Sequence, residues 1–96
     1  MSAYCIFDVV EITDAEKMQE YRSKVGATIE QYGGRYIVRG GPFTVVEGDW
    51  SISYPVVLEF PNLENAYRWY NSKEYRELKK LRLTAAESNG FFVEGI

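Results

Sequence analysis

The order of the predicted strands and helices constrains the fold of this chain most strongly. β-Branched and aromatic residues gather from Ala3 to Ile12, and Thr13-Asp14 then offers side-chain oxygens that can cap a helix. Apolar residues next recur at helical spacing until Gly33-Gly34. These residues are Met18, Tyr21, Val25, Ile29 and Tyr32. Gly26, inside this helical stretch, costs about 1 kcal/mol relative to Ala, which predicts close packing at that position.

Extended segments with β-type composition follow the long helix. Arg35 to Arg39 is extended, Gly40-Gly41-Pro42 interrupts it, and Phe43 to Glu47 resumes it, so we expect one bent strand or two short ones. Tyr54 to Phe60 is the next predicted strand, with Pro55 near its start, where a missing N–H is tolerated.

The remainder predicts two short helices and a last strand. Asn62 can cap a helix, and Asn71-Ser72 interrupts the periodicity before a second helix with Tyr75, Leu78 and Arg82 on one stripe. Ser88-Asn89-Gly90 is a stop signal, and Phe91 to Glu94 is a short final strand.

The resulting order, β-α-β-β-α-α-β, is the split βαβ arrangement of a ferredoxin-like α+β sandwich. We expect one domain over residues 1–96, in which a four-stranded antiparallel sheet carries its helices on one face. Alternation along the strands separates two sets of side chains. The set expected under the helices is Ile6, Val10, Tyr36, Val38, Val56, Leu58, Phe60, Phe91 and Val93. The opposite set is Phe7, Val9, Glu11, Arg35, Ile37, Arg39, Val57, Glu59, Phe92 and Glu94.

The second set is too apolar for a sheet face in contact with water. We therefore predict a homodimer whose two sheets pack face to face into a dimeric α+β barrel, against the alternative of a monomer with one wet face. Eight Tyr, five Phe and two Trp also exceed what a small monomer readily buries, and they suggest an interface or a ligand cavity.

Composition excludes several classes of function. A formal net charge of -3 disfavours nucleic acid and anionic lipid as partners. The longest apolar runs are short and no signal peptide is visible, so we expect a cytoplasmic protein. Cys5 is the only cysteine and histidine is absent, which excludes an intramolecular disulfide, a Cys/His zinc site and imidazole catalysis. We expect Cys5 to be a small buried residue.

Two groups of charged residues are candidate site residues. Arg35, Arg39, Glu59 and Glu94 share one strand face by parity, so they could bind an anionic substrate or form a structural ion-pair network. Arg82 shares the helical stripe of Tyr75 and is expected to point toward the sheet. There it could pair with Glu47 or Glu59.

Loop and junction residues supply further candidates. In the turn Glu47-Gly48-Asp49-Trp50, Glu47 could act as a base and Trp50 as a stacking wall, or Trp50 could only pin the turn. At the junction of the two short helices, Ser72 could cap the helix or contact a ligand, and Tyr75 could donate its hydroxyl. We expect Trp69 and Tyr70 to be packing residues.

Four motifs together carry a resemblance to a known family. They are Gly33-Gly34-Arg35-Tyr36, Glu47-Gly48-Asp49-Trp50, Glu59-Phe60-Pro61 and Trp69-Tyr70-Asn71-Ser72-Lys73-Glu74-Tyr75. In this order the chain resembles the domain of unknown function 1330 family, within the dimeric α+β barrel superfamily, from about Tyr4 to Gly95. The resemblance implies a ferredoxin-like protomer and a side-by-side dimer, but no activity. Lys73 stands where the family pattern has Pro.

Together these observations predict a homodimer that binds a small organic ligand, anionic or aromatic, with no cofactor and no metal. Any catalysis would be cofactor-free proton transfer or rearrangement, with Glu47 as the base and Arg35, Arg39 and Tyr75 as orienting or electrophilic partners. The alternative is a non-catalytic ligand-binding or structural dimer whose charges only organise the interface. Haem degradation, known in related barrels, is disfavoured by the lack of a histidine ligand, although ligation of the iron by tyrosine stays open.

Overall fold

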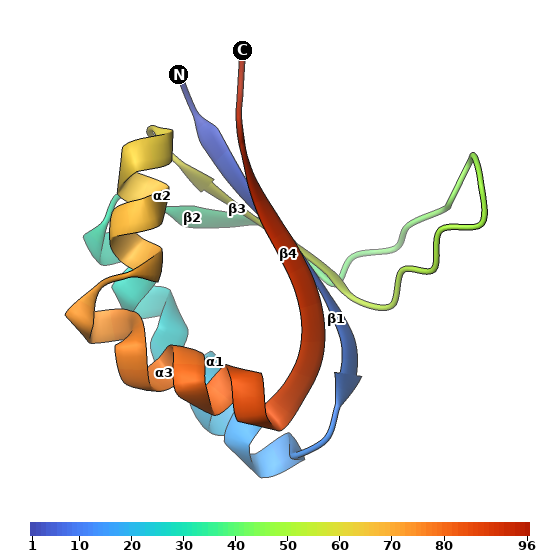
Figure 1. Ribbon diagram of the computed structural model, residues 1–96, viewed down its shortest axis with the longest axis horizontal. Helices are drawn as coiled ribbons and strands as arrows, with labels where there is room; N and C mark the ends of the chain where they lie inside the picture. The colour runs from blue at the N-terminus through green and yellow to red at the C-terminus, as the bar shows by residue number, and fades with distance from the viewer.

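Three helices cover one face of a four-stranded antiparallel sheet in the computed structural model, which describes residues 1–96 (Figure 1). The chain order matches the predicted one. The elements are β1 (Ala3–Ile12), α1 (Ala15–Gln31), β2 (Arg35–Arg39), β3 (Pro55–Phe60), α2 (Leu63–Tyr70), α3 (Lys73–Ala85) and β4 (Ala86–Glu94). The strand order across the sheet is β2-β3-β1-β4, so the predicted ferredoxin-like topology is confirmed. None of the helices is both long and apolar enough to cross a membrane.

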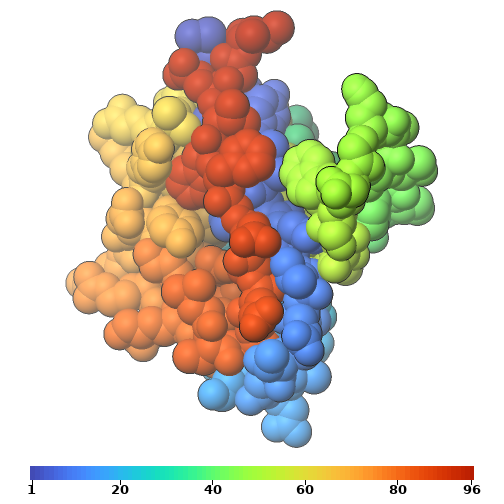
Figure 2. Space-filling model, turned by 45° about the vertical axis from the view of Figure 1, so that its right-hand side comes forward, coloured from blue at the N-terminus to red at the C-terminus, as the bar shows by residue number.

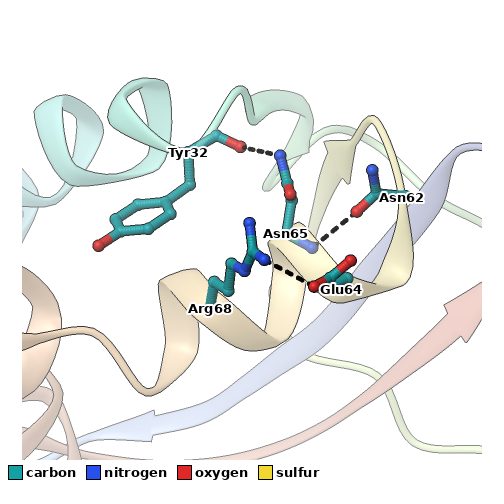
Figure 3. Close-up of polar contacts among 5 residues, drawn as sticks. All are labelled: Tyr32, Asn62, Glu64, Asn65 and Arg68. Atoms are coloured by element: carbon teal, nitrogen blue, oxygen red, sulfur yellow. Dashed lines mark hydrogen bonds and ion pairs between the residues drawn. The ribbon is translucent and has the colours of Figure 1, made fainter.

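Side-chain caps define where each helix begins, as the sequence predicted. The Asp14 side chain caps α1, Asn62 Oδ1 accepts a bond from the Asn65 N–H at 2.7 Å, and Ser72 Oγ accepts one from the Tyr75 N–H at 3.1 Å. The Asn65 side chain also donates to the Tyr32 carbonyl at 3.1 Å, which ties the start of α2 to the end of α1 (Figure 3).

The predicted strand Phe43 to Glu47 is absent. Residues 40–54, hereafter the arm, contain no strand and project from the sheet on the side away from the helices (Figures 1 and 2). The arm is closed at its base, where the Gly40 N–H donates to the Pro55 carbonyl at 2.7 Å. An extended sequence needs a neighbouring strand to form a ladder, and the arm has none within this chain.

The last strand is longer than predicted, because Ser88-Asn89-Gly90 lies inside β4 instead of stopping it. Gly90 pairs with Phe7 of β1, and a Cβ at Gly90 would overlap the Phe7 ring. The glycine therefore makes room for an aromatic side chain on the neighbouring strand. In the sequence, a glycine with this packing role looks the same as a glycine that marks a turn.

The predicted assignment of the two sheet faces is correct for β3 but reversed for β1 and β4. Cys5 and Phe7 pack in or against the core under the helices, together with Phe92. Ile6, Phe91 and Val93 consequently lie on the face without helices, hereafter the open face. Val10 has no partner on β4, because the pairing shifts between Val9 and Glu11. In β1 and β4 the odd-numbered and the even-numbered residues both include large apolar side chains. Alternation therefore divides the residues between two faces without indicating which face meets the helices.

A bulge in β2 corrects a further prediction. The pairing shifts between Tyr36 and Val38, so that Val38 stands opposite Val57 and Arg39 stands opposite Val56. Because Val56 faces the helices, the bulge moves Arg39 to the helix-covered face and Val38 to the open face.

The core lies between the sheet and the helices and is centred on aromatic rings. Trp69 packs on Tyr75 with ring centroids 4.2 Å apart and on Phe60 at 5.6 Å, and its Nε1–H donates to Thr28 Oγ1 at 3.0 Å. The predicted packing roles of Trp69 and Tyr70 are confirmed. Cys5 is fully buried, as predicted, and burial raises the pKa of its thiol to about 12.

Candidate functional site

A cavity of about 230 Å³ lies between the helix-covered face of the sheet and helices α1, α2 and α3. All four strands and all three helices contribute to its walls. The lining consists of Phe7, Val9, Met18, Tyr21, Arg22, Ile29, Tyr36, Arg39, Tyr54, Val56, Leu58, Trp69, Arg82 and Ser88. This lining contains three arginines and no carboxylate, although the chain as a whole carries a net charge of -3.

Arg82 of α3 is the buried charge of this cavity. Its side chain is 7% exposed, and it donates from Nε to Tyr75 Oη at 3.2 Å and from Nη1 to Ser88 Oγ at 2.8 Å. Its guanidinium carbon lies 5.3 Å from the centre of the Phe7 ring. No carboxylate forms an ion pair with Arg82, so the predicted pairing with Glu47 or Glu59 is wrong.

The charge of Arg82 persists despite burial. Burial alone would lower the pKa of its guanidinium, but the neighbouring Tyr75 and Tyr21 outweigh this effect and raise the pKa. The two phenols form a short hydrogen bond between their hydroxyl oxygens at 2.8 Å. Burial, the largest cause, raises the pKa of both phenols, so both hydroxyls keep their protons at neutral pH.

Two further arginines on the lining are exposed and stack on aromatic rings. The Arg22 guanidinium carbon lies 5.8 Å from the centre of the Tyr54 ring, and that of Arg39 lies 5.0 Å from the centre of the Tyr36 ring. The positive charge thus extends from the buried end at Arg82 to the solvent-exposed side of the cavity. This gradient favours entry of an anion.

The predicted strand-face cluster is only partly assembled. Arg35 and Glu59 form an ion pair with a 2.7 Å distance between Nη2 and Oε1, and Tyr4 donates to Glu59 at 3.4 Å. Arg39 lies on the other face because of the bulge, and Glu94 is exposed near the end of β4. The Arg35–Glu59 pair lies outside the cavity, so the predicted grouping of these four residues is wrong.

Glu47 and Trp50 lie on the arm and line a different hollow. This groove of about 570 Å³ runs between the arm and the neighbouring parts of β1, β3 and β4, and only Phe7 belongs to both the groove and the cavity. Trp50 is 69% exposed. The chain therefore does not bring Glu47 and Trp50 to Arg39 or Arg82, and a role for them in a site stays a prediction.

The junction of α2 and α3 is structural in its observed contacts. Ser72 caps α3, as predicted, and its hydroxyl also donates to the Trp69 carbonyl at 2.7 Å. Neither Ser72 nor Tyr75 lines the cavity. Tyr75 reaches it indirectly, because it bonds to both Tyr21 and Arg82.

Sequence reasoning overlooked Tyr21 and Ser88 as site residues. Tyr21 belongs to the apolar stripe of α1, where a tyrosine indicates packing, and Ser88 lies in what resembles a turn signal. The excess of tyrosine was the available signal, since a buried hydroxyl needs a partner. No three Cys, Asp or Glu side chains are grouped as metal ligands would be.

Comparison with solved structures supports the fold. A protein of unknown function from Rhodopseudomonas palustris, RPA0582, is 19% identical with a TM-score of 0.75, over 99% of this chain and 82% of that one. SnoaB, a cofactor-independent oxygenase from Streptomyces nogalater, is 11% identical with a TM-score of 0.62, over 99% and 91% of the two chains. A dimeric protein of unknown function with a ferredoxin-like fold from Bacteroides fragilis is 16% identical with a TM-score of 0.53, over 98% and 94%.

Comparison with family models identifies the family. No curated protein matches the chain significantly. The model of the domain of unknown function DUF1330 matches residues 2–96, nearly the whole chain, in agreement with the four sequence motifs and with the ferredoxin-like topology. The chain therefore belongs to the DUF1330 family.

Proposed function

We propose that this protein binds a small organic anion with a planar, apolar body in the cavity beside Arg82. The single observation that carries the proposal is the buried guanidinium of Arg82, which faces a cavity and has no acidic partner. Moving a charged side chain out of water costs several kcal/mol, and proteins usually offset this cost with an opposite charge. Here the ligand would supply that charge.

The size and the walls of the cavity support a ligand with one ring. An apolar cavity of about 150 Å³ can hold benzene, so about 230 Å³ accommodates a single ring with an acidic substituent. Phe7, Tyr36, Tyr54 and Trp69 offer aromatic surface to the ring. Arg82 offers hydrogen-bond donors to the acidic group.

Any catalysis in this cavity would rest on stabilising an anion that forms on the ligand. A guanidinium beside an enol or a phenol lowers the pKa of that enol or phenol, so the enol or phenol loses its proton to water more readily and without a cofactor. SnoaB, described as a cofactor-independent oxygenase, shares the fold, which supports this interpretation by analogy only. Tyr75 contributes by holding Arg82 and Tyr21.

The predicted base, Glu47, lines the arm groove and not the cavity, so it would act only on a ligand that reaches the groove. Its test is Glu47→Gln, assayed on any anion that the wild-type protein binds. Lower turnover at unchanged affinity supports Glu47 as a base, whereas unchanged turnover and affinity contradict that role.

We also propose that a second copy of the chain covers the open face. Its exposed apolar side chains include Phe91 at 51%, Val93 at 42% and Val38 at 37%. The arm, whose exposed apolar residues include Trp50 and Val46, projects from the same side of the sheet (Figure 1). A contiguous apolar face of this kind is typical of an interface. Light scattering after size exclusion is expected to give about twice the 11.1 kDa chain mass, and a monomer at micromolar concentration would contradict the dimer.

The ligand proposal is tested by thermal shift with matched anionic and neutral compounds, such as benzoate and benzamide or salicylate and its methyl ester. An anion at 100 times its Kd stabilises the folded state by about 2.7 kcal/mol, which raises Tm by roughly 10–20 °C in a domain of this size. We expect the anions, and not the neutral partners, to raise Tm.

Two variants of α3 complete this test. Arg82→Met is expected to abolish the shift produced by the anion, whereas Arg76→Met, an exposed arginine of the same helix, is expected to retain it. Equal shifts with anionic and neutral compounds, or no shift with any member of the panel, would contradict the proposed function. The latter result would favour the structural dimer.

A further inference from the structure

We propose that Tyr21 and Ser88 join Arg82 in an oxyanion pocket, in which each of the three presents a hydrogen-bond donor to one acidic group of the ligand. This inference rests on the proposed function and adds the chemistry of recognition: the donors favour a ligand with a deprotonated, negatively charged oxygen. The direction of each hydrogen bond in the buried series Arg82–Tyr75–Tyr21, and of the one between Arg82 and Ser88, supports this inference.

The direction of the hydrogen bond between the two phenols follows from the surroundings of Tyr75. Its hydroxyl is fully buried and has two partners, Arg82 Nε at 3.2 Å and Tyr21 Oη at 2.8 Å. The Arg82 nitrogen can only donate. Tyr21 Oη is therefore the one acceptor available to the Tyr75 proton, and leaving that buried proton unpaired would be costly. Tyr75 consequently donates to Tyr21.

This direction leaves the Tyr21 proton without a protein acceptor. Tyr21 Oη has Tyr75 as its only protein partner, and Tyr21 lines the cavity. Its O–H is thus directed to whatever occupies the cavity. Because the series begins at a charged guanidinium, each bond along it strengthens the next, and Tyr21 becomes a stronger donor than an isolated phenol.

Ser88 and Arg82 present donors in the same way. Ser88 Oγ accepts from Arg82 Nη1 at 2.8 Å and makes no other hydrogen bond, so its own proton is free toward the cavity that it lines. Arg82 Nη2 makes no hydrogen bond, and no fully buried side-chain nitrogen or oxygen in the chain lacks a partner. Nη2 is therefore not fully buried, and Arg82 lines the cavity.

The lining thus offers donors and no carboxylate acceptor at its buried end. A carboxylate, phenolate or enolate oxygen would accept charge-assisted hydrogen bonds from all of these donors, whereas the oxygen of a neutral alcohol or amide is a weaker acceptor. Specificity for the deprotonated form of the ligand follows, in addition to the charge attraction of Arg82.

The test uses 4-nitrophenol as the probe, because its phenolate absorbs visible light. Nitrobenzene, which keeps the nitro-substituted ring but lacks the phenolic oxygen, is the neutral analogue. Wild-type protein is expected to bind the phenolate more tightly than nitrobenzene and to lower the pKa of the bound phenol. Tyr21→Phe and Ser88→Ala are each expected to weaken phenolate binding roughly tenfold or more and to leave nitrobenzene binding unchanged.

Tyr32→Phe and Ser23→Ala are the matched controls, since both remove a hydroxyl outside the cavity. If Tyr21→Phe does not fold, Ser88→Ala alone decides. Unchanged phenolate affinity in the folded variants, with a loss only in Arg82→Met, would overturn the oxyanion pocket and leave the proposed function standing. Absence of phenolate and benzoate binding by the wild-type protein would overturn both.

Discussion

Replacing Arg82 by methionine tests whether this arginine serves ligand binding or the stability of the fold. Methionine fills the space of the aliphatic stem and adapts to irregular gaps. The change removes two hydrogen bonds from a charged donor, to Tyr75 and Ser88, and a contact with the Phe7 ring. It also removes a charge that is 7% exposed and has no acidic partner.

Losing these interactions destabilises the folded protein, whereas removing the unpaired buried charge stabilises it, and the two free-energy changes are similar in size. Each hydrogen bond from a charged group contributes about 1.5–3 kcal/mol, and the cation–π contact about 1 kcal/mol, so roughly 4–7 kcal/mol of interaction is lost. Burying an unpaired ion costs several kcal/mol of desolvation free energy, and the methionine variant does not carry this cost. We therefore expect the free energy of unfolding to change by less than about 2 kcal/mol.

Urea denaturation followed by tryptophan fluorescence measures this change, because Trp69 is buried in the core and lines the cavity. Arg76→Met, exposed on the same helix, is the control and is expected to stay within about 0.5 kcal/mol of wild type. A loss above about 4 kcal/mol for Arg82→Met would refute the reasoning, since the guanidinium would then be required for folding.

Four further predictions concern positions away from Arg82. Gly26→Ala should stabilise the protein by about 1 kcal/mol and raise Tm by roughly 4–8 °C, because a Cβ at this position would meet no neighbouring atom within 4 Å. A lower Tm than that of the wild type would contradict this prediction. The Cys5 thiol, with its pKa raised to about 12, should react with Ellman's reagent at pH 8 only after unfolding, and rapid labelling of the native protein would contradict its burial. The hydrogen bond from Arg35 lowers the pKa of the Glu59 carboxyl below its usual value. The stabilising effect of the ion pair is therefore present above the usual pKa and is lost as pH falls through the lowered one. Glu59→Gln should therefore lose less stability than wild type on acidification, measured by denaturant midpoints, and parallel losses would contradict the ion pair. Phe91→Asp on the open face should yield monomers by light scattering, whereas an unchanged dimer mass would place the interface elsewhere.

The fold was predictable because strand composition, helical period and capping residues agree along the chain. Asp14, Asn62 and Ser72 each cap the helix that follows them, and each was recognisable as a residue type. The prediction for Gly26 was wrong, since its helical position has open space where close packing was expected. Local signals thus indicated the order of elements, but they did not report what lies beside each residue.

The candidate site was less predictable, because it depends on which strand parity meets the helices. Both parities of β1 and β4 are apolar, and one bulged residue in β2 moves Arg39 to the other face. Arg82 was correctly expected to point inward, but its partners, Tyr75 and Ser88, are polar groups without charge. The absence of a nearby carboxylate is a property of the assembled tertiary structure.

A crystal structure of the protein with the tightest-binding anion of the panel tests the central claim most directly. We expect the acidic oxygen of the ligand within about 3.2 Å of Arg82 Nη2, with the ring against Phe7 and Tyr36. The claim is that the ligand supplies the negative charge that pairs with Arg82. It would be contradicted by an anion found only at the exposed Arg22 and Arg39, or only on the open face with water in the cavity.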